Sequence, residues 1–176
     1  MTTFRAGRND EPSFLQRVAG AVGLGDGPEA TVTDDLDGWL DRTLKDALGF
    51  KVQRDDDGDI PIPYGSAVVF VRHSEPESPF LEIFAPLLEG FTMSPEVYEA
   101  VNSINMQVAM AKAIVDADEK QIILTAALPV IGTLSSDELI LAIELVAEAA
   151  DHFDSLLQKR FGGTTMLDDD ADEFNV

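Results

Sequence analysis

Apolar residues recur at helical spacing in three stretches of the chain. The longest stretch runs from Ser135 to Phe161 without proline or glycine, and its apolar residues recur at steps of three and four. This stripe consists of Leu139, Ile143, Val146, Ala150, Phe153 and Leu157. Ser135 and Glu138 fit a capping box and Gly162 fits a left-handed stop, so the pattern predicts a helix of roughly 40 Å. The acidic residues of this stretch are expected outside the buried stripe: Glu144, Glu148, Asp151 and Asp154.

Two shorter helices are expected before it. The first spans residues 33–49, with Thr33 as N-cap, Gly49 as stop, and four leucines on one face. Trp39 lies at the edge of that face, where it either covers the core or forms an exposed aromatic anchor of the kind that dominates protein interfaces. The second helix opens at Ser94-Pro95-Glu96, an N-cap followed by proline at the first helical position.

Between the helices the apolar pattern changes to a period of two, which predicts strands. The expected strands are residues 50–53, 60–64, 67–71, 80–85, 106–115 and 121–128. Pro61 and Pro63 have no N–H for a ladder, so strand 60–64 is expected at an edge, and Pro86 is expected to end strand 80–85. The short connections favour antiparallel pairing. The fold class predicted is therefore α+β: a largely antiparallel sheet of five to six strands packed with three helices, in the order α-β-β-β-(β)-α-β-β-α.

A chain of 176 residues with 45% hydrophobic content predicts one folded domain plus tails. We expect a flexible N-terminal arm at 1–32, a single domain at 33–163 and an acidic disordered tail at 164–176. In the arm, Phe14, Val18 and Val22 share a helical face, which is typical of a loose arm or of a docking helix for a partner. The tail contains Phe174 among acids, so it either solubilises the protein or docks as a short acidic–aromatic motif.

The formal net charge of −21 bears on possible partners. Binding to a phosphate backbone needs a clustered basic surface, so nucleic acid is not an expected partner, and anionic membrane surfaces are disfavoured for the same reason. No apolar run approaches the roughly 20 residues of a membrane span. The chain has no cysteine, which excludes disulfides and thiolate metal sites and fits a reducing compartment. We therefore expect a cytoplasmic protein.

Candidate chemistry is sparse. The acidic stretch 55–59 suggests a calcium loop, but aligning Gly58 with the invariant loop glycine puts Gln53 and Tyr64 where acids are required. A solvated hairpin turn is the better interpretation. His73 and His152 lie in different elements, and neither a serine elbow nor a phosphate-binding loop occurs. The sequence thus predicts no catalytic, metal-binding or cofactor-binding residues, no cofactor and no enzymatic activity.

Four segments carry a resemblance to a known family. They are Asp57-Gly58-Asp59-Ile60, Val101-Asn102-Ser103-Ile104-Asn105, the hairpin 111–128, and Phe161-Gly162-Gly163. In this order, over residues 33–163, the chain resembles the YbjN-like family, which is related to the type III secretion chaperones. The resemblance implies a helix–sheet–helix–sheet–helix fold, often dimeric, that holds segments of client proteins against exposed apolar grooves. It implies neither a cofactor nor a reaction.

Two functional hypotheses follow. The first is a non-enzymatic, chaperone-like domain that holds or stabilises a segment of a protein or peptide client. Its candidate contact residues are Leu36, Trp39, Leu40, Ile60, Ile62 and Tyr64, because an exposed sheet edge is a template for an added strand. The alternative is a self-associating structural or regulatory module without a client. Its candidate homodimer interface consists of Tyr98, Val101, Met106 and Met110.

Overall fold

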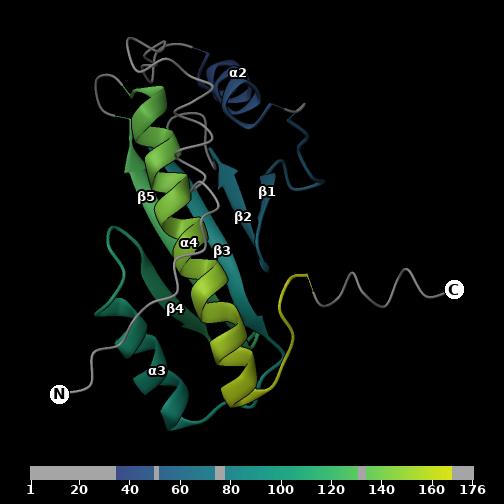
Figure 1. Cartoon of the computed structure of the whole chain (residues 1–176), viewed down its shortest axis with the longest axis vertical. Coiled ribbons are helices and arrows are strands. Elements are labelled where there is room, and N and C mark those ends of the chain that lie inside the picture. The colour runs from purple at the N-terminus through teal and green to yellow at the C-terminus, as the bar shows by residue number, and fades with distance from the viewer. Residues whose placement is uncertain (1–34, 50–51, 74–77, 131–133, 168–176) are drawn as a thin grey trace, which may run out of the picture.

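The structure is a computed structural model, and it describes residues 35–49, 52–73, 78–130 and 134–167. Within these residues the chain forms three helices and one sheet of five strands (Figure 1). The elements in chain order are α2 (Leu36–Leu48), β1 (Ile60–Tyr64), β2 (Ala67–Arg72), β3 (Phe80–Glu89), α3 (Pro95–Asn105), β4 (Lys112–Asp116), β5 (Gln121–Pro129) and α4 (Ser136–Phe161). The predicted α+β class, the three helices and the antiparallel sheet are confirmed.

The strands are ordered β1-β2-β3-β5-β4, and every neighbouring pair is antiparallel. This order makes β1 an edge strand, as its prolines predicted. α4 lies across β3, β2 and β5, α3 packs on β4, and α2 contacts α4 (Figure 1). In the described part of the chain, the helices therefore cover one face of the sheet.

The long helix α4 begins after Ser135 and ends before Gly162, as the sequence predicted, but Gly162 has φ 69° and ψ −160° and not the left-handed helical conformation that was expected. The Ser135 hydroxyl accepts the Glu138 N–H at 3.2 Å, and the Glu138 carboxylate accepts the Ser135 N–H at 3.0 Å, which completes the capping box. Two acids, however, lie inside the buried region and not outside it: Glu144 and Asp154. For Asp154 the reason is a local partner, because its Oδ2 lies 2.8 Å from the Ser66 hydroxyl. This contact fixes the turn between β1 and β2 to α4.

The first helix is shorter than expected. α2 begins at Leu36, and Asp35 is its N-cap, since the Asp35 side chain accepts the Gly38 N–H at 3.0 Å. The predicted cap, Thr33, lies outside the described residues. Gly49 ends the helix with φ 73°, in the left-handed region that favours glycine.

The segment before β1 differs from its prediction. Residues 50 and 51 lie outside the described residues, and residues 52 and 53 belong to no strand. The described half of the predicted strand 50–53 is therefore not a strand. The acidic stretch 55–59 is a turn that leads into β1. Asp55 organises it, because its Oδ1 accepts the N–H groups of Asp57 at 3.1 Å and Asp59 at 2.8 Å.

Two strand boundaries were predicted wrongly. β3 does not end at Pro86 but continues to Glu89, with a register shift between Pro86 and Leu88 that accommodates the missing N–H. The strand predicted over 106–115 begins only at Lys112, because Met106 is still the C-cap of α3. The apolar run alone did not reveal where the helix ends and the strand begins.

The C-terminal boundary also shifts. Glu89 and Thr164 exchange backbone hydrogen bonds of 2.9 and 3.0 Å, so residues 164–167 lie against the end of β3. The sequence analysis had placed these four residues in the tail. Residues 168–176 and the predicted arm at 1–32 lie outside the described residues.

Candidate functional site

The sheet has a second face, opposite the helices, on which apolar side chains gather. Successive side chains of a strand point to opposite faces, so Val69 joins the core while Phe70 points the other way. The strand registers place Phe70 opposite Phe84, and Ile123 opposite Ile114. We call this set the open face: Val68, Phe70, Phe84, Ile114 and Ile123. None of the five belongs to the core cluster, and no helix of the described residues covers them.

The two phenylalanines of the open face form one unit with an arginine. The rings of Phe70 and Phe84 stack with centroids 5.2 Å apart. The Arg72 guanidinium lies 4.7 Å from the centre of the Phe84 ring, in a cation–π contact. Arg72 also donates from Nε to Glu82 at 2.7 Å and reaches Asp59 Oδ2 with Nη1 at 3.6 Å. A charged row thus borders the aromatic pair across three strands.

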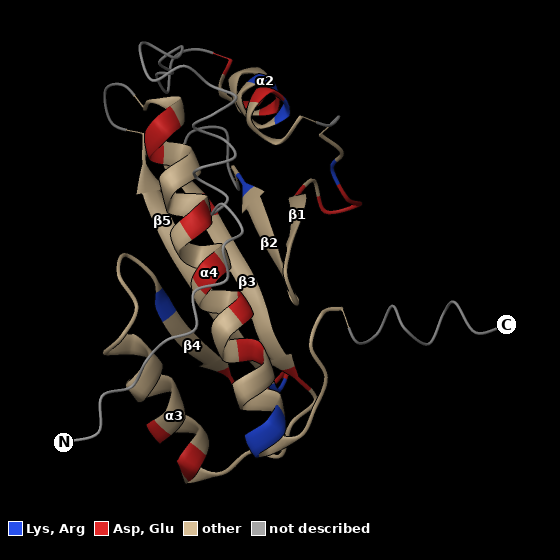
Figure 2. Cartoon of the chain, in the orientation of Figure 1, with Lys and Arg blue, Asp and Glu red and all other residues tan. Residues whose placement is uncertain are grey.

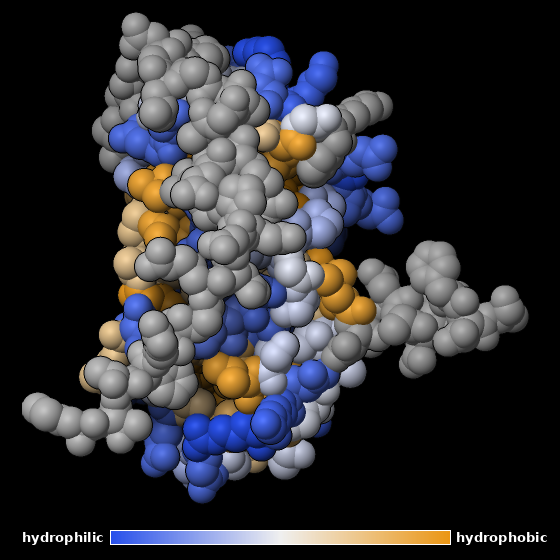
Figure 3. Space-filling model, in the orientation of Figure 1, coloured by the Kyte–Doolittle hydropathy of each residue, from blue (hydrophilic) through white to orange (hydrophobic). Residues whose placement is uncertain are grey.

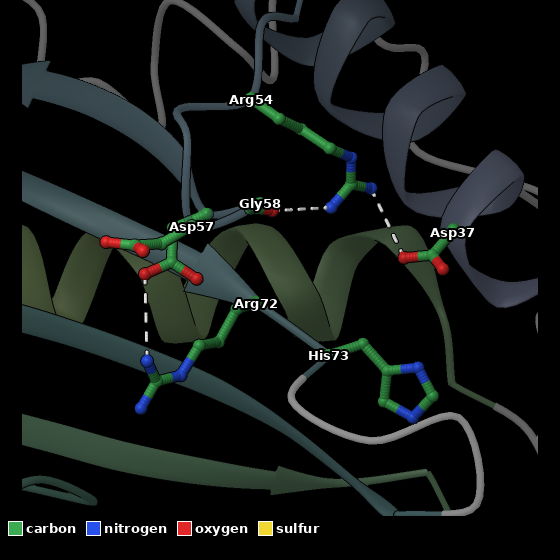
Figure 4. Close-up of a pocket in the computed structure, with 7 residues that line it drawn as sticks. Asp37, Arg54, Asp57, Gly58, Arg72 and His73 are labelled. Atoms are coloured by element: carbon green, nitrogen blue, oxygen red, sulfur yellow. Dashed lines mark hydrogen bonds and ion pairs between the residues drawn. The ribbon is translucent and has the colours of Figure 1, made fainter.

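A polar pocket of about 390 Å³ lies at the end of this row (Figure 4). It is lined by Asp37, Arg54, Asp57, Gly58, Asp59, Arg72 and His73. Arg54 joins the turn 54–59 to α2 there, since it donates to the Gly58 carbonyl at 3.0 Å and contacts Asp41 at 2.8 Å and Asp37 at 3.3 Å. The His73 ring contacts the Ser78 carbonyl through Nε2 at 3.0 Å.

The carboxyl group of Asp59 in the pocket has a raised pKa. Burial raises the pKa of its carboxyl above the usual value, Arg72 opposes that rise, and Asp55, Asp57 and Glu82 add to it. The potential at this end of the sheet is therefore negative despite the two arginines. A cationic group of a partner would be attracted to it.

The contacts of the pocket indicate a structural role. Both arginines are held by carboxylates from other parts of the pocket. Within the described residues there is no group of three side chains that could hold a metal ion. The second histidine, His152, is exposed on α4 and packs edge-on against Phe153. The pocket fixes α2, the turn 54–59 and β2 to one another.

The six contact residues predicted from the sequence lie mostly in the interior. Five of them are buried in the core: Leu36, Trp39, Leu40, Ile60 and Ile62. For Trp39 the structure thus decides between the two interpretations, because a side chain only 3% exposed covers the core. Tyr64 alone is partly exposed. The peptide-binding role of the six stays a prediction, and a contact through the buried five would require α2 or β1 to move.

The four residues predicted for a dimer interface lie on and after α3. Tyr98 is 53% exposed and Met106 81% exposed, and Met110 is also exposed in the loop before β4. Val101 is buried against the core instead. Three of the four are therefore accessible, and the interface stays a prediction.

The edge at β1 is poorly suited to strand addition. In an antiparallel ladder the N–H and C=O of one residue point to the same side. Pro61 and Pro63 cannot donate to β2, so their backbone positions face outward and the flanking residues pair with β2. The outward positions of β1 at Pro61 and Pro63 therefore offer carbonyls but no N–H. This edge accepts a partner strand less readily than the sequence analysis expected.

The sequence analysis named none of the five residues of the open face as contact residues, although a signal was present. Residues 67–71 are continuously apolar, which predicts a central strand, and such runs are typical of strands buried on both faces. The structure shows helices on one face only among the described elements. The side chains at alternate positions therefore lie on a face without described helices: Phe70 is half-buried there, while Val68 is buried.

Comparisons with known proteins agree with this fold. Residues 34–169 match the family model described as T3SS (YopN, CesT) and YbjN peptide-binding chaperone 1. Among solved structures, the ExsC–ExsE complex is similar with a TM-score of 0.56 and 15% identity, over 70% of this chain and 97% of that chain. YbjN from E. coli is similar with a TM-score of 0.57 and 14% identity, over 75% and 97%.

The HopA1–SchA chaperone–effector complex is similar with a TM-score of 0.51 and 13% identity, over 66% of this chain and 90% of that chain. No curated protein matches the chain. No helix of the described residues is long and apolar enough to cross a membrane. At these identities the solved structures establish the fold alone, whereas the family model covers most of the sequence. The chain therefore belongs to the family of T3SS (YopN, CesT) and YbjN peptide-binding chaperones.

Proposed function

We propose that this protein is a non-enzymatic chaperone that holds a segment of a client protein on the open face. The observation that carries this proposal is an apolar sheet face, centred on Phe70 and Phe84, that no described helix covers. Exposed apolar patches rimmed by polar residues are typical of protein-binding surfaces. Membership of a peptide-binding chaperone family supports the same function. Two structures with this fold are the ExsC–ExsE complex and the HopA1–SchA chaperone–effector complex.

The chemistry of the open face indicates what such a client segment would offer. Phe70, Phe84 and Ile123 would pack against apolar side chains that alternate along an extended segment. The acidic end of the face, where Asp59 and Glu82 surround Arg72, would favour a lysine or arginine at that end of the client. Because the edge at β1 is poor in donors, side-chain packing would contribute more to affinity than backbone pairing.

The proposal includes a cytoplasmic location and a homodimer. The absence of cysteine from the sequence is consistent with a reducing compartment. Self-association is supported by the exposure of Tyr98, Met106 and Met110, because methionines adapt to partner surfaces and tyrosines are enriched at interfaces. A self-associating module without a client is thus the second candidate function. Light scattering over a dilution series tests it, and a monomer at all concentrations would remove it.

The client-binding proposal is tested by comparing two aromatic surfaces. Proteins that co-purify with the full chain are identified by mass spectrometry, and overlapping peptides of each are titrated against purified protein. Replacing Phe70 and Phe84 together by alanine should weaken binding of the tightest-binding peptide at least about 10-fold, since aromatic anchors dominate binding energy. Tyr98→Ala is the matched control on α3 and should bind normally. A folded Phe70→Ala/Phe84→Ala protein with unchanged affinity would refute the site.

A further inference from the structure

The apolar surface of α4 is wider than the sheet that it covers. A helix at the surface of a globular protein needs one apolar stripe toward the core, and the stripe around Val146 and Leu157 fulfils this need. A second row of apolar residues runs beside that stripe at steps of four, four, four and three. We call it the α4 flank: Leu141, Leu145, Ala149, Phe153 and Leu156. Leu141 is 43% and Leu156 52% exposed, and the other three are half-buried.

The α4 flank is continuous and ends in a hollow. Residues at steps of three and four are neighbours on a helix surface, so the five side chains form one ridge of about 22 Å. Figure 3 shows apolar surface beside α4, on the side where α3 lies. Between α3 and α4 there is a hollow of about 140 Å³, to which Phe153 and Leu156 contribute from one side and Ile104 from the other. A space of that size accommodates a benzene ring, so one large apolar side chain would fill it.

The borders of the flank are mainly acidic. Glu148 is exposed on α4 next to the flank, and Glu96 and Glu99 are exposed on α3 (Figure 2). A hydrogen bond from Ser94 lowers the pKa of Glu96, with a smaller contribution from Arg160, so this carboxylate is ionised at neutral pH. The cations nearby are at the end of α4, where Lys159 and Arg160 occupy the last turn. Over most of its length, the flank therefore favours a partner with basic residues beside its apolar ones.

We propose that the α4 flank and the hollow against α3 bind one amphipathic helix of a protein partner, about four turns long, with an apolar stripe edged by lysine or arginine. A helix fits because it satisfies its own backbone hydrogen bonds, whereas a strand would need a sheet edge that this surface does not provide. Its ridge of residues at steps of three and four packs into a matching groove. The flank is on the helix side of the sheet, so this proposal goes beyond the open face and does not depend on it.

The test uses designed peptides and the full chain. A fluorescein-labelled peptide of 16 residues carries leucine at helical spacing and lysine on both sides of the stripe. A second peptide has the same leucines with glutamate in place of lysine. Fluorescence anisotropy should show the lysine peptide binding at least about 10-fold more tightly than the glutamate peptide, with a difference that shrinks as salt is added. Equal affinity for the two peptides would overturn the proposal.

Substitutions locate the binding surface. Leu141→Asp and Leu156→Asp change exposed side chains, so both proteins should fold, which circular dichroism checks. Each should weaken binding of the lysine peptide at least about 10-fold, while Phe84→Ala on the open face should leave the affinity for this peptide unchanged. If Leu156→Asp disturbs folding, Leu156→Ala takes its place, with a smaller loss expected. Normal binding by folded flank variants would overturn the proposal.

Two other occupants give distinct results, and either would overturn the proposal. If a second copy of the chain covers the flank, light scattering will show a dimer that Leu156→Asp dissociates. If the chain's own N-terminal segment covers it, Val18→Asp in the full chain will raise affinity for the lysine peptide several-fold by removing a competitor. An association state that Leu156→Asp leaves unchanged, together with a peptide affinity that Val18→Asp leaves unchanged, supports binding of a partner helix.

Discussion

Asn105 is expected to hold together the junction between α3 and β4, and its replacement by alanine should show this. The Ala113 N–H donates to the Asn105 side-chain oxygen at 2.6 Å, and the Asn105 amide donates to the Ala113 carbonyl at 3.1 Å. Ala113 is buried on the edge strand β4, and the amide of Asn105 pairs with its backbone much as a further strand would. A net contribution of about 0.5–1.5 kcal/mol for each hydrogen bond gives a loss of about 1–3 kcal/mol.

Asn102→Ala provides the matched control. Asn102 is exposed on the same helix about one turn earlier, so both variants replace asparagine by alanine on α3, with a gain in helix propensity of up to about 0.7 kcal/mol at Asn102 and less at Asn105, the last helical residue. The difference between the two variants then isolates the contact with Ala113. Urea unfolding followed by circular dichroism should separate them by about 1–3 kcal/mol, and Tm should differ by about 2–12 °C, since 1 kcal/mol shifts the Tm of a chain of this size by about 2–4 °C. Equal stability of the two variants would refute the reasoning.

Three further substitutions test two buried side chains and the capping box of α4. Val146→Asp should unfold the domain, because Val146 is fully buried in the α4 stripe and a lone buried charge costs several kcal/mol. Near-normal thermal melting would contradict the burial of that stripe. Ser66→Ala should lower the free energy of unfolding by about 1–3 kcal/mol, since it removes the hydroxyl beside the buried Asp154. Urea unfolding measures this loss, and an unchanged midpoint would contradict it. Hydrogen bonds from the backbone and hydroxyl of Ser135 lower the pKa of Glu138 below its ordinary value of 4.5. The stability from this ionised carboxylate is present above that value and is lost as the pH falls through the lower folded pKa, so the wild type should lose more stability in acid than Glu138→Gln. Parallel curves of stability against pH for the two proteins would contradict this.

The segment 101–105 illustrates how a sequence pattern acquires a physical meaning. From the sequence it was one of four segments that supported a resemblance. In the structure, Val101 and Ile104 are buried while Asn105 bonds to the backbone of β4. The same contact explains the wrong start of the predicted strand 106–115, since Asn105 connects to Ala113 across a loop that the apolar pattern does not reveal.

The candidate site was only partly accessible from the sequence. Periodicity correctly grouped Leu36 and Leu40 with Trp39, and the prolines of β1 correctly placed that strand at an edge. It gave no means of deciding which apolar residues would be covered. That decision depends on α4, which comes last in the chain and lies across three strands that precede it.

The sequence by itself determined the local elements and the fold class. Spacing of apolar residues, the capping box at Ser135 and the stops at Gly49 and Gly162 depend on interactions within a few residues, so they can be recognised along the chain. Tertiary structure decided which apolar residues form the core and which form the open face and the α4 flank. It also explained why Asp154 is buried, through the Ser66 hydroxyl that comes from a distant turn. Burial depends on what packs against a residue from elsewhere in the chain, and no local pattern contains that information.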